Sequence, residues 1–222
     1  MKPSTLNQAF AAMIITLFVA LATLPGTAAA KDDPWKFRFA VVSMNPTGDA
    51  IDVPETGETF PYQSSSGVGA AFGLEYRASR WVGIDFGIIS ASPDFTVIVG
   101  SEPESISAKT DIRVTPIYAA LNIHLIPDGR FDLYIGPLLA YVTYDSFVIE
   151  AGPGEREGVS AEEDFGVGAV LGLDIGLGRG RWSLVTAIRY LDTTLEAQPA
   201  AGDVGKTDFD PTIFSVGFGY RF

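Results

Sequence analysis

The stretch Phe214-Ser-Val-Gly-Phe-Gly-Tyr-Arg-Phe222 decides the fold of this chain. Every second residue in it is apolar, and the residues between are Ser, Gly, Gly and Arg. Side chains of a β-strand alternate between the two faces of its sheet. The stretch therefore predicts a strand with one broad apolar face and one narrow face of glycine and charge.

The same alternation occurs in eight segments, each about 9 to 15 residues long, which is enough for a tilted strand to cross a bilayer. The segments are 35–44, 67–77, 81–91, 112–125, 131–144, 165–177, 181–195 and 211–222. They predict an all-β fold, an eight-stranded antiparallel up-and-down transmembrane β-barrel.

The connections between these segments alternate strictly in length. Those at 78–79, 126–130 and 178–180 are tight turns, whereas those at 45–66, 92–111, 145–164 and 196–210 are long and rich in Gly, Pro, Ser and acid. Strict alternation places all short turns at one end and all long loops at the other. Transmembrane barrels have this asymmetry, with short periplasmic turns and long external loops.

The apolar face decides between a membrane barrel and a water-soluble barrel. A soluble barrel places its bulky apolar side chains inside, so glycine would occupy its water-facing side without benefit. The lumen of an eight-stranded barrel is barely wide enough for side chains, so glycine fits inside and the aromatic face meets lipid. A charge on that face costs about 2–4 kcal/mol at mid-bilayer, which explains why it carries none.

Aromatic residues gather at the predicted short-turn end. Trp35, Tyr76, Phe131, Trp182 and Tyr220 form the expected interfacial girdle there. Trp81 is an exception, because its parity places it on the lumen side together with Asp85. The alternative is that Trp81 lies just below the bilayer.

The first 30 residues resemble a cleaved secretory signal peptide rather than part of the fold. Lys2 precedes an apolar stretch over 11–24 and a small-residue run that ends as Ala28-x-Ala30. We expect cleavage after Ala30 and a barrel domain over 31–222. A retained membrane anchor is the alternative, although the apolar stretch is shorter than the roughly 20 residues of a spanning helix.

Composition excludes several kinds of chemistry. The formal charge of −12 argues against a nucleic-acid partner, which needs a basic face. The chain has no cysteine, so disulfides, zinc-thiolate sites and cysteine nucleophiles are absent. The 24 glycines and 12% aromatic residues, without long amphipathic helical patterns, agree with an all-β chain.

Inward parity divides the predicted lumen into two halves. The half near the short turns carries charged residues that we expect to form a hydrogen-bonded plug: Arg38, Glu75, Arg77, Asp85, His124, Asp132, Asp174 and Arg221. The half near the long loops is apolar apart from Arg189, and we expect an outward-opening ligand pocket there, lined by Ala40, Val42, Ile89, Tyr118, Leu138, Val142 and Leu191. The alternative is that these side chains merely fill the barrel.

Enzymatic and metal-binding interpretations find little support. His124 is the only histidine and is expected near the periplasmic end, away from outer-leaflet lipid, so we expect no catalytic site and no cofactor. The loop acids Glu150, Glu155, Glu157, Glu162, Glu163 and Asp164 have the oxygen ligands that Ca²⁺ or Mg²⁺ prefers, but a solvated acidic surface is the favoured interpretation, so no metal is expected. A structural or adhesive surface protein is the alternative to transport.

Several motifs, in order, resemble the outer membrane protein W family. They include Val114-Thr-Pro-Ile-Tyr-Ala-Ala-Leu-Asn-Ile-His-Leu125, Pro127-Asp-Gly-Arg-Phe131 and Gly217-Phe-Gly-Tyr-Arg-Phe222. The resemblance implies a bacterial outer-membrane barrel with a hydrophobic channel, linked to uptake of small apolar molecules or to stress response. At the predicted location we expect contact with outer-membrane lipid and lipopolysaccharide. Tyr220 and Phe222 fit the family's terminal signal for the barrel-assembly machinery.

Overall fold

The computed structural model describes residues 33–48, 50–53, 57–99, 106–127, 129–152, 155–178, 180–199 and 205–222. The expected signal peptide lies outside the described residues and stays a prediction. Among the described residues, no helix is long and apolar enough to span a membrane.

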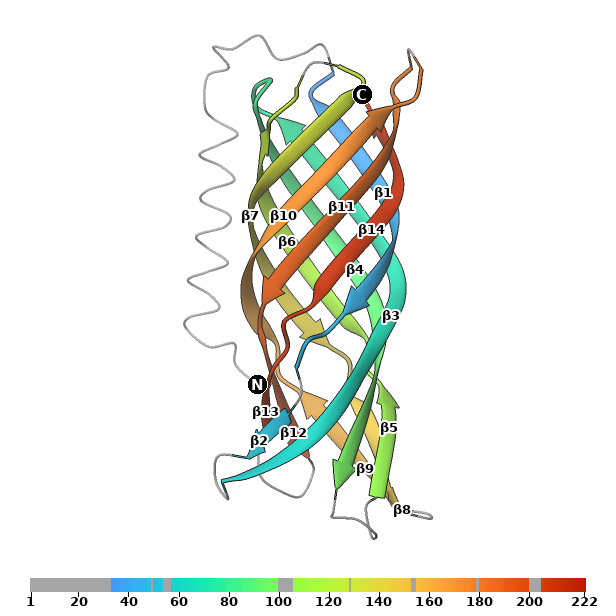
Figure 1. Cartoon of the computed structure of the whole chain (residues 1–222), viewed down its shortest axis with the longest axis vertical. Helices are drawn as coiled ribbons and strands as arrows, with labels where there is room; N and C mark the ends of the chain where they lie inside the picture. Colours follow the sequence, from blue (N-terminus) through green and yellow to red (C-terminus); the bar gives the residue numbers. More distant parts are fainter. Residues whose placement is uncertain are drawn as a thin grey trace.

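Eight antiparallel strands close into a barrel, which confirms the predicted fold class. In order around the barrel they are β1 (Trp35–Asn45), β3 (Glu58–Arg77), β4 (Val82–Val99), β6 (Val114–His124), β7 (Phe131–Tyr144), β10 (Asp164–Gly176), β11 (Trp182–Asp192) and β14 (Thr212–Arg221). β14 closes the ring, because its residues pair with β11 on one side and with β1 on the other. The three tight turns and the C-terminus lie at one end (Figure 1).

A second tier of strands continues the barrel wall beyond its other end (Figure 1). It consists of β2 (Ala50–Val53), β5 (Ile106–Asp111), β8 (Phe147–Gly152), β9 (Glu155–Ala161), β12 (Thr194–Pro199) and β13 (Gly205–Asp208), together with the far ends of β3 and β4. Neighbouring strands pair in the order β5-β4-β3-β2-β13-β12-β9-β8. β5 and β8 lie in contact, but no ladder joins them in the part of the chain that the structure describes.

The second tier corrects the strand boundaries expected from sequence. β3 begins at Glu58 and not at residue 67, and β4 continues to Val99 and not to residue 91. The four long connections, expected as loops, contain the other six strands of this tier. Beyond the apolar band of the barrel, no face has to meet lipid. These strands therefore lack the apolar alternation by which a membrane strand is recognised.

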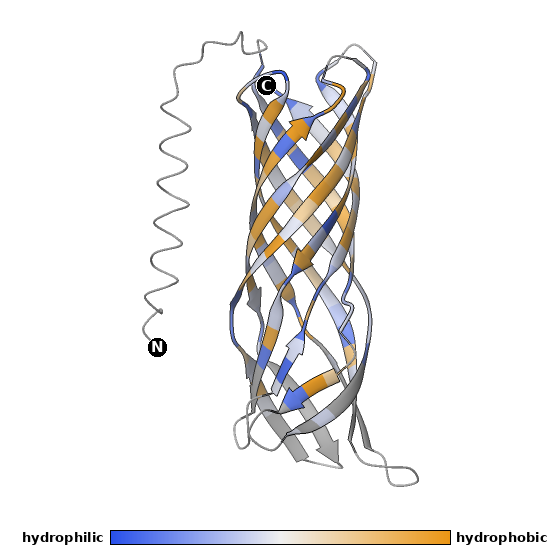
Figure 2. Cartoon of the chain, turned by 60° about the vertical axis from the view of Figure 1, so that its left-hand side comes forward, coloured by the Kyte–Doolittle hydropathy of each residue, from blue (hydrophilic) through white to orange (hydrophobic). Residues whose placement is uncertain are grey.

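Apolar residues are concentrated along the strands between the two ends of the barrel (Figure 2), and large apolar side chains are exposed on its outer face. Phe37, Phe39 and Val41 of β1 are each more than 40% exposed, as are Phe214, Val216 and Phe218 of β14. The aromatic girdle lies at the short-turn end, where Trp35 packs on Tyr76 and Trp182 packs on Tyr220, with ring centroids 4.8 and 5.0 Å apart.

The position expected for Trp81 was wrong. Its side chain is 47% exposed, in the turn before β4, and the Arg80 guanidinium stacks over its ring at 4.8 Å. Trp81 lies one residue before β4, where its carbonyl oxygen still accepts a hydrogen bond of 2.8 Å from the His124 amide, but its ring is exposed at the end of the barrel.

Glycine allows the strands and the inward side chains to approach closely. A Cβ on Gly217 would lie 1.9 Å from the Phe39 carbonyl oxygen of the neighbouring strand. A Cβ on Gly172 would lie 2.1 Å from the Tyr134 ring, which covers this glycine inside the barrel. Glycines on one strand thus make room in the narrow lumen for large inward side chains on the next strand.

Candidate functional site

A buried polar cluster crosses the lumen near the short-turn end. Its members are at most 8% exposed and come from six of the eight barrel strands: Lys36, Arg38, Glu75, Arg77, Asp85, Asn122, His124, Asp132 and Asp174. We refer to this cluster as the polar plug. It brings together every residue predicted for the plug except Arg221.

Glu75 lies at the centre of the polar plug and is fully buried. Its Oε2 accepts a hydrogen bond of 2.7 Å from Arg38 Nη2 and lies 3.6 Å from Arg77 Nε. Its Oε1 accepts a hydrogen bond of 3.2 Å from Asn122 and lies 2.9 Å from His124 Nε2. One carboxylate therefore holds side chains from β1, β3 and β6 together.

Arg38 reaches across the lumen to three acids. Besides Glu75, its guanidinium lies 3.2 Å from Asp174 and 3.3 Å from Asp85. Lys36, two residues before Arg38 on the same face of β1, also forms an ion pair with Asp174. The Tyr134 ring lies 5.1 Å from the Arg38 guanidinium carbon, a cation–π distance.

His124 is fixed between two carboxylates. Its Nδ1 lies 2.8 Å from Asp132 and its Nε2 lies 2.9 Å from Glu75. Asp132 also forms an ion pair with Arg77. Since both ring nitrogens face acceptors, a doubly protonated ring would donate a hydrogen bond to each.

Pairing makes this burial of charge tolerable. An isolated charge is very costly to bury, whereas a hydrogen-bonded pair recovers much of the lost hydration. Since the ion pairs join strands across the lumen as well as neighbours, they close the barrel over its cross-section.

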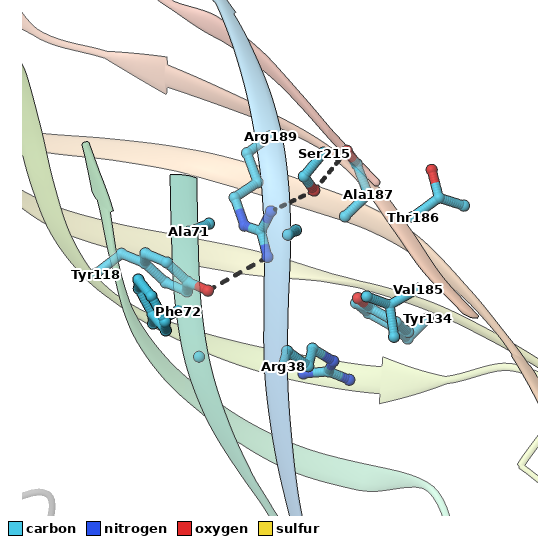
Figure 3. A pocket seen from close by; sticks show the side chains of 12 residues that line it. Arg38, Ala71, Phe72, Tyr118, Tyr134, Val185, Thr186, Ala187, Arg189 and Ser215 are labelled. Atoms are coloured by element: carbon cyan, nitrogen blue, oxygen red, sulfur yellow. Dashed lines mark hydrogen bonds between the residues drawn. The ribbon is translucent and has the colours of Figure 1, made fainter. Parts of the chain in front are cut away.

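A small cavity lies next to Arg38, and its other lining residues include Ala71, Ala187 and Arg189. Figure 3 shows these side chains around it. It measures about 20 Å³, room for roughly one water molecule. Arg189 donates hydrogen bonds to Ser215 at 3.1 Å and to the Tyr118 hydroxyl at 3.3 Å, and it lies 3.9 Å from Asp85. Arg189, the charged residue that the sequence places in the apolar half, thus extends the polar zone along the lumen.

Beyond this cavity the lumen is filled by apolar side chains. All residues predicted for the ligand pocket point inward and are 0–5% exposed: Ala40, Val42, Ile89, Tyr118, Leu138, Val142 and Leu191. Among them, Ala40 and Tyr118 line the small cavity. Met44, Phe209 and Ile213, each 0% exposed, continue the packing toward the second tier.

A larger cavity of about 410 Å³, which we call the vestibule, opens on the other side of the polar plug, at the short-turn end. Its wall includes Lys36, Asp132 and Asp174, which belong to the plug, and also Asp33, Arg130, Arg181 and Arg221. Arg221, predicted as a plug residue, faces this cavity. No carboxylate of the described residues lies within ion-pair distance of it.

A lipid-facing wall, a closed eight-stranded ring and a charged lumen together define a membrane barrel. Residues 14–222 match the family model described as outer membrane protein beta-barrel domain. The chain belongs to this family. The outer membrane is therefore its location, and the short turns mark the periplasmic end of the barrel. No curated protein shows a significant sequence match.

Solved structures show the same fold at low sequence identity. OprG from Pseudomonas aeruginosa is 19% identical with a TM-score of 0.69, and the match covers 86% of this chain and 97% of OprG. The outer membrane protein AlkL, solved in DMPC lipid bilayers, is 19% identical with a TM-score of 0.59, covering 88% of this chain and 93% of AlkL. Neisserial surface protein A is 12% identical with a TM-score of 0.52, covering 85% of this chain and 97% of that protein. The predicted outer-membrane barrel is thus confirmed.

Two further predictions concern the ends of this outer-membrane barrel. Tyr220 and Phe222 stack at the periplasmic rim with ring centroids 6.4 Å apart, and their role as an assembly signal stays a prediction. At the external end, Glu162 and Glu163 are exposed, and Asp164 accepts a hydrogen bond of 2.7 Å from the Thr194 amide. The side chains of Glu150, Glu155 and Glu157 lie outside what the structure describes. Within the described residues, no group of three acids or histidines is placed to hold a metal ion.

Sequence reasoning missed Tyr134 and Ser215 as functional neighbours. Both point inward by the same period-two parity that found the charged residues, so the signal was present. They were overlooked because only charge marked the plug. A buried hydroxyl group or aromatic ring that contacts an arginine is uncharged, so charge alone does not identify it in the sequence.

Proposed function

We propose that this outer-membrane barrel admits small hydrophobic molecules from its external end and releases them sideways into the membrane. One observation carries the proposal. The lumen is apolar toward the exterior and crossed by ion pairs toward the periplasm, so an apolar guest is favoured in one half and excluded from the other.

The polar plug argues against an axial route. A molecule passing through it has to separate ion pairs such as Arg38–Glu75 and Arg77–Asp132, which are almost completely buried. Removing one partner from a buried pair costs about 3–5 kcal/mol. An apolar molecule has no hydrogen bonds with which to replace the lost pairs, so the energetically open exit is through the wall.

The ladders on both edges of β6 are interrupted next to a proline. Pro116 has no amide hydrogen to donate to the ladder with β4, which pairs Ile88 with Ile117 and then Ala91 with Val114, skipping the residues between. On the other edge, Pro137 of β7 lies where the β6–β7 ladder skips from Ala120–Leu138 to Ile123–Ile135. Fewer hydrogen bonds hold β6 than a regular strand, which supports an exit beside it.

Uptake requires movement of the apolar side chains as well. Val42, Leu138, Val142 and Leu191 are at most 2% exposed, so the proposed pocket is occupied by its own lining in this closed form. A guest enters by displacing these side chains while the neighbouring ladder opens. The proposal therefore predicts that fixing β4 to β6 stops uptake without changing the fold.

A disulfide tests the exit directly, because the chain has no cysteine of its own. The Ser90 and Thr115 hydroxyls lie 3.5 Å apart across the interrupted ladder, so Ser90→Cys with Thr115→Cys is suited to a cross-link. The matched control is Ser43→Cys with Val68→Cys, an opposed pair in the continuous β1–β3 ladder. Accumulation of the apolar dye N-phenylnaphthylamine is measured in cells that produce each variant.

We expect oxidation to abolish barrel-dependent dye accumulation in the β4–β6 variant and reductant to restore it, while the control stays active in both states. Equal uptake by the oxidised and reduced β4–β6 variant would refute the lateral exit. A large, salt-proportional current in planar bilayers would refute the closed plug, because a plugged lumen conducts few ions.

A structural or adhesive surface protein is the second candidate function. The observation that favours it is the second tier, which projects beyond the apolar band as paired strands on a barrel that its own side chains fill. Replacing residues 147–161, which contain β8 and β9, with a short Gly-Ser linker separates the candidates. Loss of surface attachment with unchanged dye uptake would favour adhesion.

A further inference from the structure

The vestibule, on the periplasmic side of the polar plug, has more basic than acidic side chains in its wall. It opens at the periplasmic end, and its volume of about 410 Å³ is that of a small-molecule site. It plays no part in the proposed uptake, because the plug separates it from the apolar half of the lumen.

Each acid in the vestibule wall is already engaged. Asp33 pairs with Arg181 at 3.1 Å. Asp132 is held by Arg77 and His124, and Asp174 is held by Lys36 and Arg38. Each of these carboxylates therefore already has a cationic partner, and only Asp174 keeps a buried oxygen, Oδ1, that accepts no hydrogen bond from the described residues.

Arg221 is the cation that these acids leave unbalanced. Its Nη1 is buried and has no hydrogen-bond partner among the described residues. The lumen supplies five lysine and arginine side chains, Lys36, Arg38, Arg77, Arg189 and Arg221, against the four acids Glu75, Asp85, Asp132 and Asp174, even before any charge on His124 is counted. Arg130 at the vestibule rim likewise has no acid within ion-pair distance in the described part of the chain.

The sequence explains why arginines converge here. Arg130-Phe131, Arg181-Trp182 and Arg221-Phe222 are arginine–aromatic pairs at the periplasmic end. In each pair the aromatic residue is about half exposed on the outside, where it meets the membrane interface, and the preceding arginine lines the vestibule. Three arginines, each next to an interfacial aromatic residue in the sequence, thus lie in the wall of one cavity.

We propose that the vestibule binds a small anion with phosphate or carboxylate groups, which approaches from the periplasmic side and is held by Arg221 and Arg130. Guanidinium matches such oxygens in geometry and charge. The chain as a whole carries −12, so this mouth is a local reversal of sign and not a reflection of a basic protein. The oxygens would fill the unused hydrogen-bonding positions of Arg221.

Pyrophosphate is a suitable probe, and calorimetric titration of the full barrel refolded in a nonionic detergent measures its binding. The variants are Arg221→Gln and Arg130→Gln, singly and together. Arg113→Gln is the matched control, because Arg113 is an exposed arginine at the opposite end, 3.8 Å from Asp145. Refolding in detergent avoids the cellular assembly machinery, and heat-modifiable gel migration verifies that each variant is folded.

We expect saturable binding of one pyrophosphate per barrel, about fivefold or more weaker in each single variant, in line with a partly exposed charge pair, and unchanged in Arg113→Gln. Equal affinity of the double variant and the parent, or no saturable binding by the parent, would overturn the proposal. Nanodiscs distinguish two sources of the anion. Inhibition by phosphatidylglycerol assigns the site to a lipid headgroup, and undiminished binding assigns it to a soluble periplasmic anion.

Discussion

Replacing Glu75 with Gln tests whether the polar plug holds the barrel together. The substitution preserves size but removes the charge that faces Arg38 at 2.7 Å, Arg77 at 3.6 Å and His124 at 2.9 Å. Breaking a buried pair from one side costs about 3–5 kcal/mol. Arg38 keeps Asp174 and Asp85 as partners, so we expect the lower limit, about 3 kcal/mol, or more than a hundredfold in the unfolding equilibrium.

The assay is urea unfolding of the refolded barrel in lipid vesicles, followed by tryptophan fluorescence. With a denaturant slope of about 1–3 kcal/mol per molar urea, the midpoint should fall by about 1–3 M. Asp85→Asn is the internal comparison. It should cost less, because Asp85 accepts no hydrogen bond from any described group. A Glu75→Gln barrel within about 1 kcal/mol of the parent would show that the plug is not a stabilising network.

Two further substitutions test the two faces of the wall by the same assay. Gly172→Ala places a methyl group 2.1 Å from the Tyr134 ring and should destabilise the barrel by about 1–3 kcal/mol. Gly176→Ala is the control, because its methyl group meets only an ordinary 3.6 Å contact. Equal effects of the two substitutions would contradict the close packing. Val216→Lys places a charge on the lipid face in the middle of β14 and should lower the free energy of unfolding by about 2–4 kcal/mol. Thr212→Lys, at the end of the strand, should lower it by only about 0–1 kcal/mol. Equal effects of the two substitutions would argue against lipid at this surface.

The side-chain directions of the barrel were predictable from the sequence. The pleat has a period of two residues, so Val41 and Val42 must face opposite sides, and they are 56% and 1% exposed. A single error of parity would have moved every residue of a strand to the wrong face. Inward and outward positions therefore follow from local alternation wherever lipid enforces it.

The second tier could not be predicted in this way. Residues 58–66 include Pro61 and three consecutive serines, which are typical of a loop, and yet they belong to β3. Their strand structure comes from pairing with β2 and β4, which depends on partners distant in the sequence. Without lipid on one face, no apolar pattern is needed, and the local signal is lost.

Contacts within the plug depend on register as well as parity. His124 meets both Glu75 and Asp132 only because β6 is staggered against β7 and because β4 contributes a glycine, Gly83, where a side chain would block the ring. A Cβ on Gly83 would lie 2.5 Å from Glu75 and 3.0 Å from His124. Sequence identified which charges enter the lumen, but the stagger that pairs them is a property of the closed ring.

The lumen also shows why closure and lateral release suit the same barrel. An eight-stranded ring is too narrow for a water-filled channel once side chains such as Tyr134 and Arg38 point inward. Polar residues at the periplasmic end consequently pair with one another, and their ion pairs join strands across the lumen. Apolar residues at the external end gain only dispersion contacts, which a hydrophobic guest replaces at little cost. Under the proposed function, the half of the barrel that admits the guest is therefore the half that has fewer directional bonds to lose. The strand β6, with its ladders interrupted near two prolines, borders that half.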